Sequence, residues 1–357
     1  MPSLHCTVRD VRRRAGFTQA RLARKAGISR QALHAVESGR SVPSTSVALG
    51  LAGALACGVE DLFSVERRRA LQAELAGPPS RRVALARIAG RWVAHPLADA
   101  GSLHVAADGL WRSGLRIEPL DPVADLEENV LVSGCDPALG VLAAHVRGIS
   151  RLVWIDAPSE KALSQLARGH AHLAGAHLFD EASGEHNIPF VRALFRGRSM
   201  LVVTLASWDV GLAVPRRDPL RIRRIEDLAR RGVRTVVRPR GSGARRLLER
   251  LLAREGVSLE RVRGPSARGH VEAAHAVAVG GADAAVVPRA VAVAEGLRFV
   301  PLARERFDLV LFEEEARDER VERILDALTG LAFRRDVASL PGYDVRDCGR
   351  VAARVLA

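Results

Sequence analysis

Cysteine is scarce in this 357-residue chain, and its spacing carries no metal signature. Cys6, Cys57, Cys135 and Cys348 lie far apart, and none forms a CxxC pair or a Cys/His group with the spacing of a metal site. This spacing leads us to expect no metal, and we expect no cofactor either. The sequence opens without a secretory signal, so we expect reduced thiols and a cytoplasmic protein. No apolar run approaches the roughly 20 residues of a membrane-spanning helix, so we expect no membrane partner.

The short motifs of common enzyme families are also missing. The chain has no GxSxG, HExxH or Walker sequence. His170, His172 and His177 lie close together in the sequence, but on one strand His172 and His177 would point to opposite faces, which argues against a shared metal. No base can be assigned to a thiol nucleophile at Cys135, which stands beside Asp136. We therefore expect no catalytic residues and no enzyme activity.

Lysine is nearly absent, with Lys25 and Lys161 as the only two, so arginine carries almost all of the positive charge. The net charge is +13 and the isoelectric point is about 11.1. The codon usage of a GC-rich genome explains a generally arginine-rich surface as well as nucleic-acid binding does. The local charge is more informative, because residues 1–64 carry nine Lys or Arg against four Asp or Glu. A phosphate backbone requires that sign.

The segment Phe17–Arg40 predicts two short helices joined by a tight turn. Thr18 is a suitable N-cap for the first helix, because its hydroxyl can accept a free backbone N–H. Gly27 suits the left-handed residue that ends this helix. Ser29 is a suitable N-cap for the second helix. The pattern is typical of a helix-turn-helix, and the alternative is a helical hairpin with a solvated polar face.

The outward residues of the second helix suit base recognition. Arg30, Gln31 and His34 lie near its start, and Arg and Gln are the usual readers of guanine and adenine. Arg40 follows the helix and is expected near a phosphate. The full set of expected DNA contacts is Thr18, Gln19, Ser29, Arg30, Gln31, His34 and Arg40.

Over Thr7–Phe63 the chain resembles the Cro/phage-repressor-like family of bacterial regulators, the xenobiotic-response-element (XRE) type. The resemblance implies a five-helix DNA-binding domain, with Gln19 near a phosphate and the second helix in the major groove of double-stranded DNA. Proteins of this class usually bind two half-sites as a dimer. We therefore expect a homodimer, and the segment Ser64–Leu75 is a candidate for the dimer contact.

Three regions follow from the pattern of the rest of the chain. Residues 1–64 are expected to form an all-α helix-turn-helix domain. Residues 65–128 are expected to form a linker helix and a connector, with a strand hairpin that turns at Gly90. In residues 129–357, strands and helices alternate, which predicts an α/β domain with mostly parallel sheets. Its expected strands include Leu201–Thr204, Val210–Val214, Phe299–Leu302 and Phe307–Phe312.

Three loops of this α/β region follow strands at their carboxyl ends, where open α/β sheets bind ligands. They are Ser133–Asp136, the segment from Gly175 through His177 to Asn187, and Arg238–Arg245. In the third loop, glycines allow close backbone approach, a serine opens a helix whose free N–H groups favour an anion, and arginines add donors. The alternatives are a helix cap at Ser133–Asp136, a structural histidine at His177 and surface charges in the third loop.

Five segments carry a second resemblance: SGCDPALGVLAAH, LAGAHLFDEASGEHN, VRPRGSGARRLLERLL, AVAVGGADAAVV and FVPLARERFDLVLF. Over about 129–338 the chain resembles the periplasmic-binding-protein-like domain fused to bacterial regulators, similar to molybdate and tungstate receptors. The resemblance implies a type II domain with two lobes joined by two crossing strands, the first lobe being 129–206 plus 298–357 and the second 211–297. A ligand would bind in the cleft between the lobes.

The residues that match the oxyanion-binding positions of this family are Ser133, Cys135, His177, Ser242, Gly243 and Asp283. Ala244 replaces the usual small hydroxyl residue, which removes one expected hydrogen bond. Together with the loop analysis, the expected ligand-binding residues are Ser133, Gly134, Cys135, Asp136, His177, Asn187, Arg240, Ser242, Gly243, Arg245 and Asp283.

The sequence therefore predicts a one-component transcriptional regulator. In this hypothesis a small anion closes the two lobes and changes the geometry of paired DNA-binding domains. Molybdate, tungstate, another oxyanion and an organic anion such as a pterin phosphate all stay open as the sensed ligand. The alternative is a ligand-independent DNA-binding scaffold that uses the receptor-like domain for oligomerisation.

Overall fold

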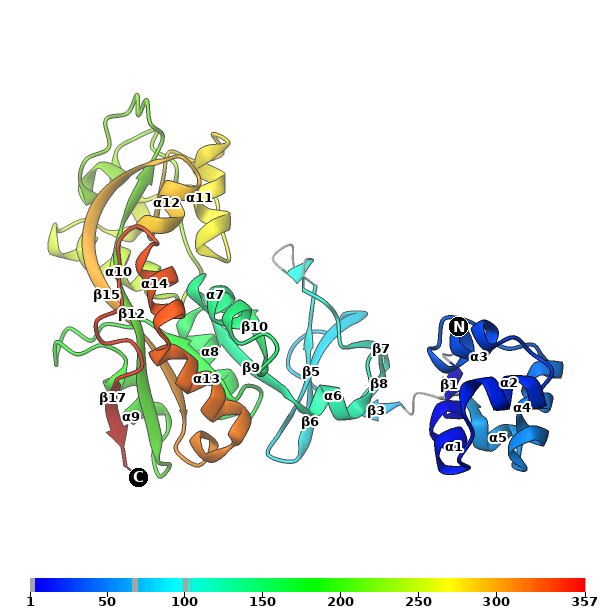
Figure 1. Ribbon diagram of the computed structural model, residues 1–357. Helices are drawn as coiled ribbons and strands as arrows, with labels where there is room; N and C mark the ends of the chain where they lie inside the picture. The colour runs from blue at the N-terminus through cyan, green and yellow to red at the C-terminus, as the bar shows by residue number, and fades with distance from the viewer. Residues whose placement is uncertain (1–3, 66–69, 99–101, 104, 357) are drawn as a thin grey trace. The chain divides into compact units, whose positions relative to one another are not determined.

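The computed structural model describes residues 4–65, 70–98, 102–103 and 105–356. The chain divides into two compact units, Met1–Ala70 and Leu71–Ala357 (Figure 1). None of the helices in the described ranges is long and apolar enough to cross a membrane.

The N-terminal unit is a small bundle of helices around a leucine-rich core. Its helices are α1 (Val8–Arg14), α2 (Gln19–Lys25), α3 (Arg30–Glu37), α4 (Thr45–Leu55) and α5 (Val59–Leu62). Thr18 Oγ1 accepts the backbone N–H of Arg21, and Ser29 Oγ accepts that of Ala32, so both predicted N-caps are confirmed. Gly27 has φ +69°, the left-handed conformation expected at the end of α2.

A short antiparallel ribbon adds to the helices of this unit. Strand β1 (Leu4–Cys6) pairs with β2 (Phe63–Val65), so the expectation of an all-α domain is wrong in this detail. The expected linker helix over Ser64–Leu75 is also wrong where the structure describes it. Its beginning lies in β2, its end forms strands β3 (Leu71–Gln72) and β4 (Glu74–Leu75), and residues 66–69 lie outside the described residues.

The second unit begins with a six-stranded sheet that the sequence predicted only as one hairpin. Strands β5 (Arg82–Ile88) and β6 (Arg91–Pro96) form that hairpin, with Ala89 and Gly90 both at positive φ in its turn. Strands β7 (Gly109–Ser113) and β8 (Arg116–Pro119) extend the sheet, whose order is β3-β8-β7-β5-β6-β4. Helix α6 (Val123–Glu127) follows it.

Buried polar side chains join this sheet to the first lobe. His172 accepts the Leu131 backbone N–H on Nδ1, which leaves Nε2–H to face the carbonyl of Arg87 at 3.2 Å. Asp108 is fully buried and accepts from the Leu85 backbone and the Asn129 amide. Because these groups are satisfied across the joint, the sheet and the first lobe form one packed body.

The two-lobed domain is built on one mixed nine-stranded sheet, so the expectation of mostly parallel pairing is wrong. Its main path is β10-β9-β11-β15-β12-β14-β13. These strands are β9 (Asn129–Gly134), β10 (Arg151–Asp156), β11 (Leu173–Ala176), β12 (Met200–Val214), β13 (Thr235–Val236), β14 (Ala284–Pro288) and β15 (Arg298–Phe312). The pairs β9–β10, β9–β11 and β13–β14 are parallel, whereas β12 and β15 pair antiparallel with their neighbours.

Strands β12 and β15 are the two crossing strands, and both run from one lobe into the other (Figure 1). The sequence predicted each of them as two separate strands. In β12 the predicted break at residues 205–209 is absent, because residues 206–209 continue to pair with β15. A register shift between Thr204 and Ala206 takes the place of a turn. Two edge strands, β16 (Tyr343–Asp344) and β17 (Val351–Val355), add to β12.

Helices cover the sheet in both lobes. In the first lobe they are α7 (Ala138–His145), α8 (Ser159–Ala167), α9 (Ile188–Leu194), α13 (Glu319–Thr329) and α14 (Leu331–Ala338). In the second lobe they are α10 (Gly243–Arg254), α11 (His270–Ala278) and α12 (Arg289–Ala294), with short 3-10 turns at Ile225–Ala229 and Leu259–Arg261. The first lobe also has a 3-10 turn, at Glu315–Arg317. Each lobe has its own apolar cores.

Candidate nucleic-acid face and interlobe site

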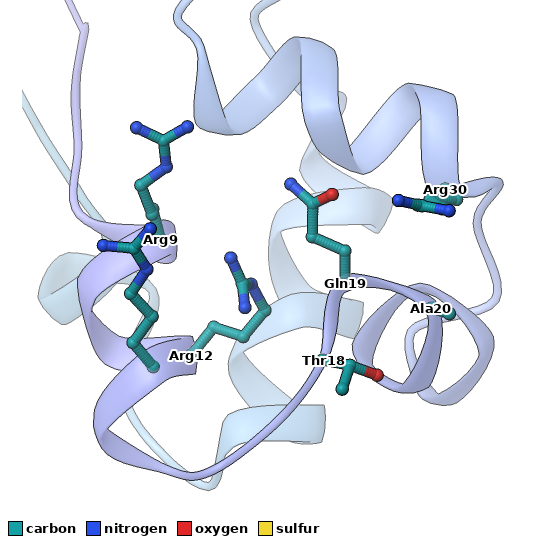
Figure 2. Close-up of a pocket in the computed structure, with 7 residues that line it drawn as sticks. Arg9, Arg12, Thr18, Gln19, Ala20 and Arg30 are labelled. Carbon is teal, nitrogen blue, oxygen red and sulfur yellow. The ribbon is translucent and has the colours of Figure 1, made fainter.

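A basic hollow of about 530 Å³ opens where α1, α2 and α3 meet (Figure 2). The residues that line it are Arg9, Arg12, Arg13, Thr18, Gln19, Ala20 and Arg30. A second hollow, of about 720 Å³, shares Gln19 and Arg30 and is completed by Gln31, His34, Ala35 and Arg40. The fold thus gathers six of the seven expected DNA contacts, and Ser29 instead caps α3.

Glu37 fixes the position of this face from within the bundle. Arg12 Nε lies 2.6 Å from Glu37 Oε1, and Gln19 Nε2 donates to Glu37 Oε2 at 2.8 Å. Burial alone raises the pKa of Glu37, but the bonds from Arg12 and Gln19 outweigh it and lower the pKa below the usual value. The carboxylate therefore stays charged and locks α1 and α2 onto the end of α3.

Arg9, Arg12 and Arg13 line the hollow but were not among the expected DNA contacts. Arg9 and Arg13 stand four residues apart on α1, a spacing that places both on one helix face. The spacing of Arg9 and Arg13 in the sequence was the signal that could have identified them as part of this face. On the other side of the face, Arg40 Nη2 lies 2.8 Å from His34 Nε2, so these two expected contacts are held together.

A buried cluster lies where the two lobes meet. Cys135 follows β9, His177 follows β11, and His270 begins α11. One ligand-type atom from each of these three residues lies within 4.8 Å of the others, and all three side chains are buried. The sequence spacing of the cysteines gave no sign of this group, because His270 comes from the other lobe.

His177 is held by a carboxylate from a crossing strand. Its Nδ1 lies 2.7 Å from Oε2 of Glu305 on β15, and both side chains are at most 2% exposed. Burial lowers the pKa of His177, but Cys135 and Glu305 together outweigh burial and raise it to about 10. The ring is therefore an imidazolium at neutral pH, and it presents an N–H at Nε2.

His270 also presents an N–H, for a different reason. Arg238 Nη1 lies 3.2 Å from His270 Nδ1, and a guanidinium can only donate. Nδ1 is thus the acceptor, and the ring proton sits on Nε2. Burial and the neighbouring Arg238 keep the pKa of His270 well below its usual value, so the ring is neutral.

Four nitrogen atoms of this cluster are buried without a hydrogen-bond partner: Nε2 of His177, Nε2 of His270, Nε1 of Trp208 and Nε of Arg238. The His177 ring centroid is 5.2 Å from that of Trp208 and 5.7 Å from that of His270. All four atoms carry hydrogen. Buried donors without an acceptor are rare and costly, so the grouping marks a place for an acceptor-rich ligand.

Asp136 borders the cluster at the start of α7. Its Oδ1 accepts from Tyr343 Oη at 2.6 Å and from the Ala138 backbone N–H at 2.8 Å, whereas Oδ2 has no partner. Burial raises its pKa to about 7. The carboxyl is therefore near half protonation at neutral pH and adds less negative charge to the site than an exposed aspartate would.

The second lobe approaches His177 through the backbone of α10. A Cβ at Gly243 would overlap the His177 ring and its carbonyl oxygen. At the rim of the interface, Arg246 pairs with Glu160, and Arg254 Nη2 lies 2.9 Å from Glu181 Oε1. These contacts show that the lobes are closed on each other.

The other expected ligand residues lie elsewhere or have partners within the protein. Ser133 donates to Gln165, Gly134 accepts the Trp154 indole N–H, and Asn187 bonds Leu178 and Asp308. Ser242 caps α10, and its hydroxyl bonds Pro239. Arg240 is exposed, Arg245 pairs with Glu249, and Asp283 pairs with Arg234. The cluster thus brings together Cys135, Asp136, His177 and Gly243 from the expected set.

Four residues of the cluster were not among the expected ligand-binding residues: Trp208, Arg238, His270 and Glu305. Arg238 opens the third predicted loop, and His270 begins a helix directly after a glycine. A polar residue that begins a helix directly after a small residue was the sequence signal that could have identified His270. Trp208 and Glu305 come from the middle of the crossing strands, which the sequence analysis divided.

The chemistry of the cluster favours an anion over a metal ion. Cys135, His177 and His270 are the residue types that bind transition metals. A metal needs a lone pair on the imidazole nitrogen, and on His270 the bond from Arg238 to Nδ1 leaves the ring hydrogen of the neutral imidazole on Nε2, where a metal would have to displace it. With Arg238 beside them, the site offers positive charge and N–H donors, which is what an oxyanion or carboxylate accepts.

Comparison with known proteins places this geometry in a family. A helix-turn-helix domain model matches residues 4–63, and a PBP superfamily domain model matches residues 142–329, which is more than half of the chain. The chain belongs to the PBP superfamily. Both parts of this PBP-superfamily chain are thus of binding types, one for DNA and one for ligands, and neither is an enzyme family.

Several relatives of this PBP-superfamily chain share parts of it. The uncharacterized protein YvgK of Bacillus subtilis is 27% identical over 235 residues, which cover 64% of this chain and 74% of YvgK. The uncharacterized HTH-type transcriptional regulator YgzD of the same organism is 37% identical over 59 residues, 16% of this chain and 89% of YgzD. An ABC-type phosphate transport receptor from Vibrio cholerae aligns with a TM-score of 0.40 and 14% identity, covering 60% of this chain and 98% of that receptor.

Proposed function

We propose that this chain is a one-component transcriptional regulator. Its N-terminal unit binds operator DNA in the manner of an XRE-type helix-turn-helix, and its two-lobed domain senses a small anion. The protein acts as a homodimer, because two recognition helices are needed to read two half-sites. The anion closes the lobes, and closure changes the affinity for DNA.

One observation carries the anion proposal: the four unpartnered N–H donors of His177, His270, Trp208 and Arg238 in the closed interface. Each buried donor without an acceptor costs about 1–3 kcal/mol. An anion that accepts from several of them removes that cost and gains charge-assisted bonds from Arg238 and the His177 imidazolium. Lobe closure is therefore favoured when the anion is bound.

The expected serines are engaged elsewhere, since Ser133 bonds Gln165 and the Ser242 hydroxyl bonds Pro239. We therefore propose that ring and guanidinium N–H groups, rather than serine hydroxyls, hold the anion. Molybdate, tungstate, other oxyanions and organic anions such as a pterin phosphate are the candidates. Each offers several oxygen acceptors to a site that consists mainly of donors.

A thermal-shift screen tests the proposal. The full chain is titrated with molybdate, tungstate, sulfate, phosphate and a panel of organic phosphates and carboxylates. A ligand that binds only the folded state raises the melting temperature in a saturable way. We expect one class of anion to do so in the wild type and in Arg240→Met, an exposed control from the same loop, but not in Arg238→Met.

Two outcomes would contradict the proposal. If no anion in the panel changes the melting temperature of the wild type, the receptor-like domain is not an anion sensor of this kind, and the ligand-independent scaffold becomes the better account. If Arg238→Met responds like the wild type, the anion binds outside the cluster.

A further inference from the structure

The net positive charge of this chain lies in two regions, residues 1–64 and the second lobe. Residues 211–297, the second lobe, carry eighteen arginines against nine acidic residues, a net charge of +9. The first lobe, 129–206 plus 298–357, carries eighteen basic and eighteen acidic residues and is neutral. Residues 65–128 are neutral too, with nine of each. Codon usage alone would spread the excess arginine over all parts, so the concentration in the second lobe needs another explanation.

Much of this charge lies in one exposed stretch. Seven arginines and only three acidic residues stand between positions 216 and 231, and all seven arginines are exposed. The stretch forms the light-green loops of the second lobe in Figure 1. Each of the three acids pairs with one arginine of the stretch: Asp218 with Arg223, Glu226 with Arg224, and Asp227 with Arg230. Among the described residues, Arg216, Arg217, Arg221 and Arg231 form no ion pair, so the stretch keeps a net charge of +4.

A second segment extends the basic surface. Ile222 and Leu228 pack in the same apolar core as Val262, and Arg234 forms a backbone bridge with Arg263. Arg261 and Arg263 are exposed beside that bridge. We call residues 216–231 together with Arg261 and Arg263 the basic band. Among the described residues, the side chains of Arg217, Arg231 and Arg261 have neither an ion pair nor a hydrogen bond.

We propose that the basic band is a second contact for the phosphate backbone of double-stranded DNA. The proposal rests on the proposed DNA binding by the helix-turn-helix unit and extends it to the ligand-binding domain. Guanidinium groups bind phosphate oxygens in pairs, and DNA offers one charge per roughly 1.7 Å of its axis. A small anion needs one pocket, whereas a row of exposed arginines suits a polymer with many charges.

The contact would be independent of base sequence. Arginines that neutralise phosphates release counterions, so each contact adds about 0.9 to the slope of log affinity against log salt. Because the chain links the band to a domain that holds DNA, the band acts at a high effective concentration even if its own affinity is low. Lobe closure moves the second lobe, so this contact also gives the ligand a route to affect DNA binding.

The test measures the binding of the full chain to a random-sequence 40-base-pair duplex by fluorescence anisotropy, from 50 to 200 mM salt. The test variant is Arg217→Glu/Arg231→Glu/Arg261→Glu. The control is Arg147→Glu/Arg168→Glu/Arg196→Glu, three exposed arginines of the first lobe that change the net charge by the same amount. Circular dichroism and thermal melting of both variants verify that each is folded.

For the band variant we expect the salt slope to fall by about 3, so its loss of affinity between 50 and 200 mM salt is about 40-fold smaller than that of the wild type. The control should keep the wild-type slope. Equal slopes for band variant and control would overturn the second contact while leaving the helix-turn-helix proposal intact. If the wild type does not bind the duplex at all, both proposals fail.

Discussion

The ring of His177 lies directly against the Cα of Gly243, and no side chain fits between them. Gly243 opens α10 in the second lobe, whereas His177 follows β11 in the first. This contact is thus a property of the closed lobes. Because Gly243 does not have positive φ, its backbone tolerates an alanine, and only the closed state excludes one.

Gly243→Ala should therefore weaken ligand binding without unfolding the protein. The added methyl group overlaps the His177 ring in the closed state, while the open state gains slightly from the better helix former. We expect the anion-induced rise in melting temperature to disappear and the ligand-free melting temperature to stay within a few degrees of the wild type. Gly53→Ala is the matched control, because a Cβ at Gly53 meets nothing within 4 Å. A full ligand response in Gly243→Ala would contradict closure around the ligand.

The raised pKa of Asp136 predicts that its contribution to the free energy of unfolding falls as the pH rises, the opposite of the usual direction for an aspartate. Burial raises its folded-state pKa to about 7, against 3.8 for a free aspartate side chain, so the folded protein holds a proton that the unfolded chain has released. Its contribution is fully present below about pH 4 and is lost as pH rises through 7, which amounts to roughly 4 kcal/mol. Asp136→Asn keeps the acceptor for Tyr343 and removes this slope.

Urea denaturation at several pH values from 4.5 to 7.5 checks this expectation. The free energy of unfolding of the wild type should fall relative to that of Asp136→Asn as the pH rises through this range. Parallel pH profiles of the two proteins would show that Asp136 is ionised in the folded state across the range.

The N-terminal unit depends on a buried charge. Removing one partner of a buried ion pair costs about 3–5 kcal/mol, because the other charge stays buried without compensation. Glu37→Ala leaves Arg12 in that position and also releases Gln19, so we expect the unit to melt at a much lower temperature and DNA binding to fall with it. Glu60→Ala, an exposed acid of the same unit, is the control and should change stability by less than about 0.5 kcal/mol. Similar melting curves for the two variants would refute the role of Glu37.

Arg30 and Gln31 should decide which DNA sequence is bound. Each side chain that reads a base edge contributes about 1–3 kcal/mol of discrimination. We expect Arg30→Ala and Gln31→Ala to lower the affinity for operator DNA selected from a random library, while their affinity for random duplex falls much less. Anion affinity should not change. An equal loss of both activities would contradict the separation into two modules.

Local signals in the sequence were sufficient for the helix-turn-helix. Thr18, Gly27 and Ser29 act on backbone groups within three residues, so their roles can be read from neighbouring letters. Long-range pairing could not be read in this way. Leu71 pairs with Ile117 and Glu74 with Val93, and nothing near Leu71 indicates either partner, which is why a polar, helix-prone stretch was predicted as a helix.

The interlobe site was predictable only in part, for a similar reason. Cys135, Asp136 and His177 stand at the carboxyl ends of strands, where open α/β sheets bind ligands. Their partner His270 lies at the start of a helix in the other lobe, and only the closed fold brings it within reach. Ser133 fits the local pattern of a ligand residue equally well, yet its hydroxyl bonds Gln165 inside the first lobe. The local sequence pattern cannot distinguish a ligand-binding serine from one whose hydroxyl is bonded within the lobe.

The coupling between anion binding and DNA binding is central to the proposed function. The direct measurement is the dissociation constant for selected operator DNA with and without a saturating concentration of the anion that stabilises the wild type. By linkage, the anion must change DNA affinity by the same factor by which DNA changes anion affinity, typically 5–150-fold. We expect such a matched change in the wild type and its loss in Arg238→Met. An operator affinity that does not respond to the bound anion would contradict it.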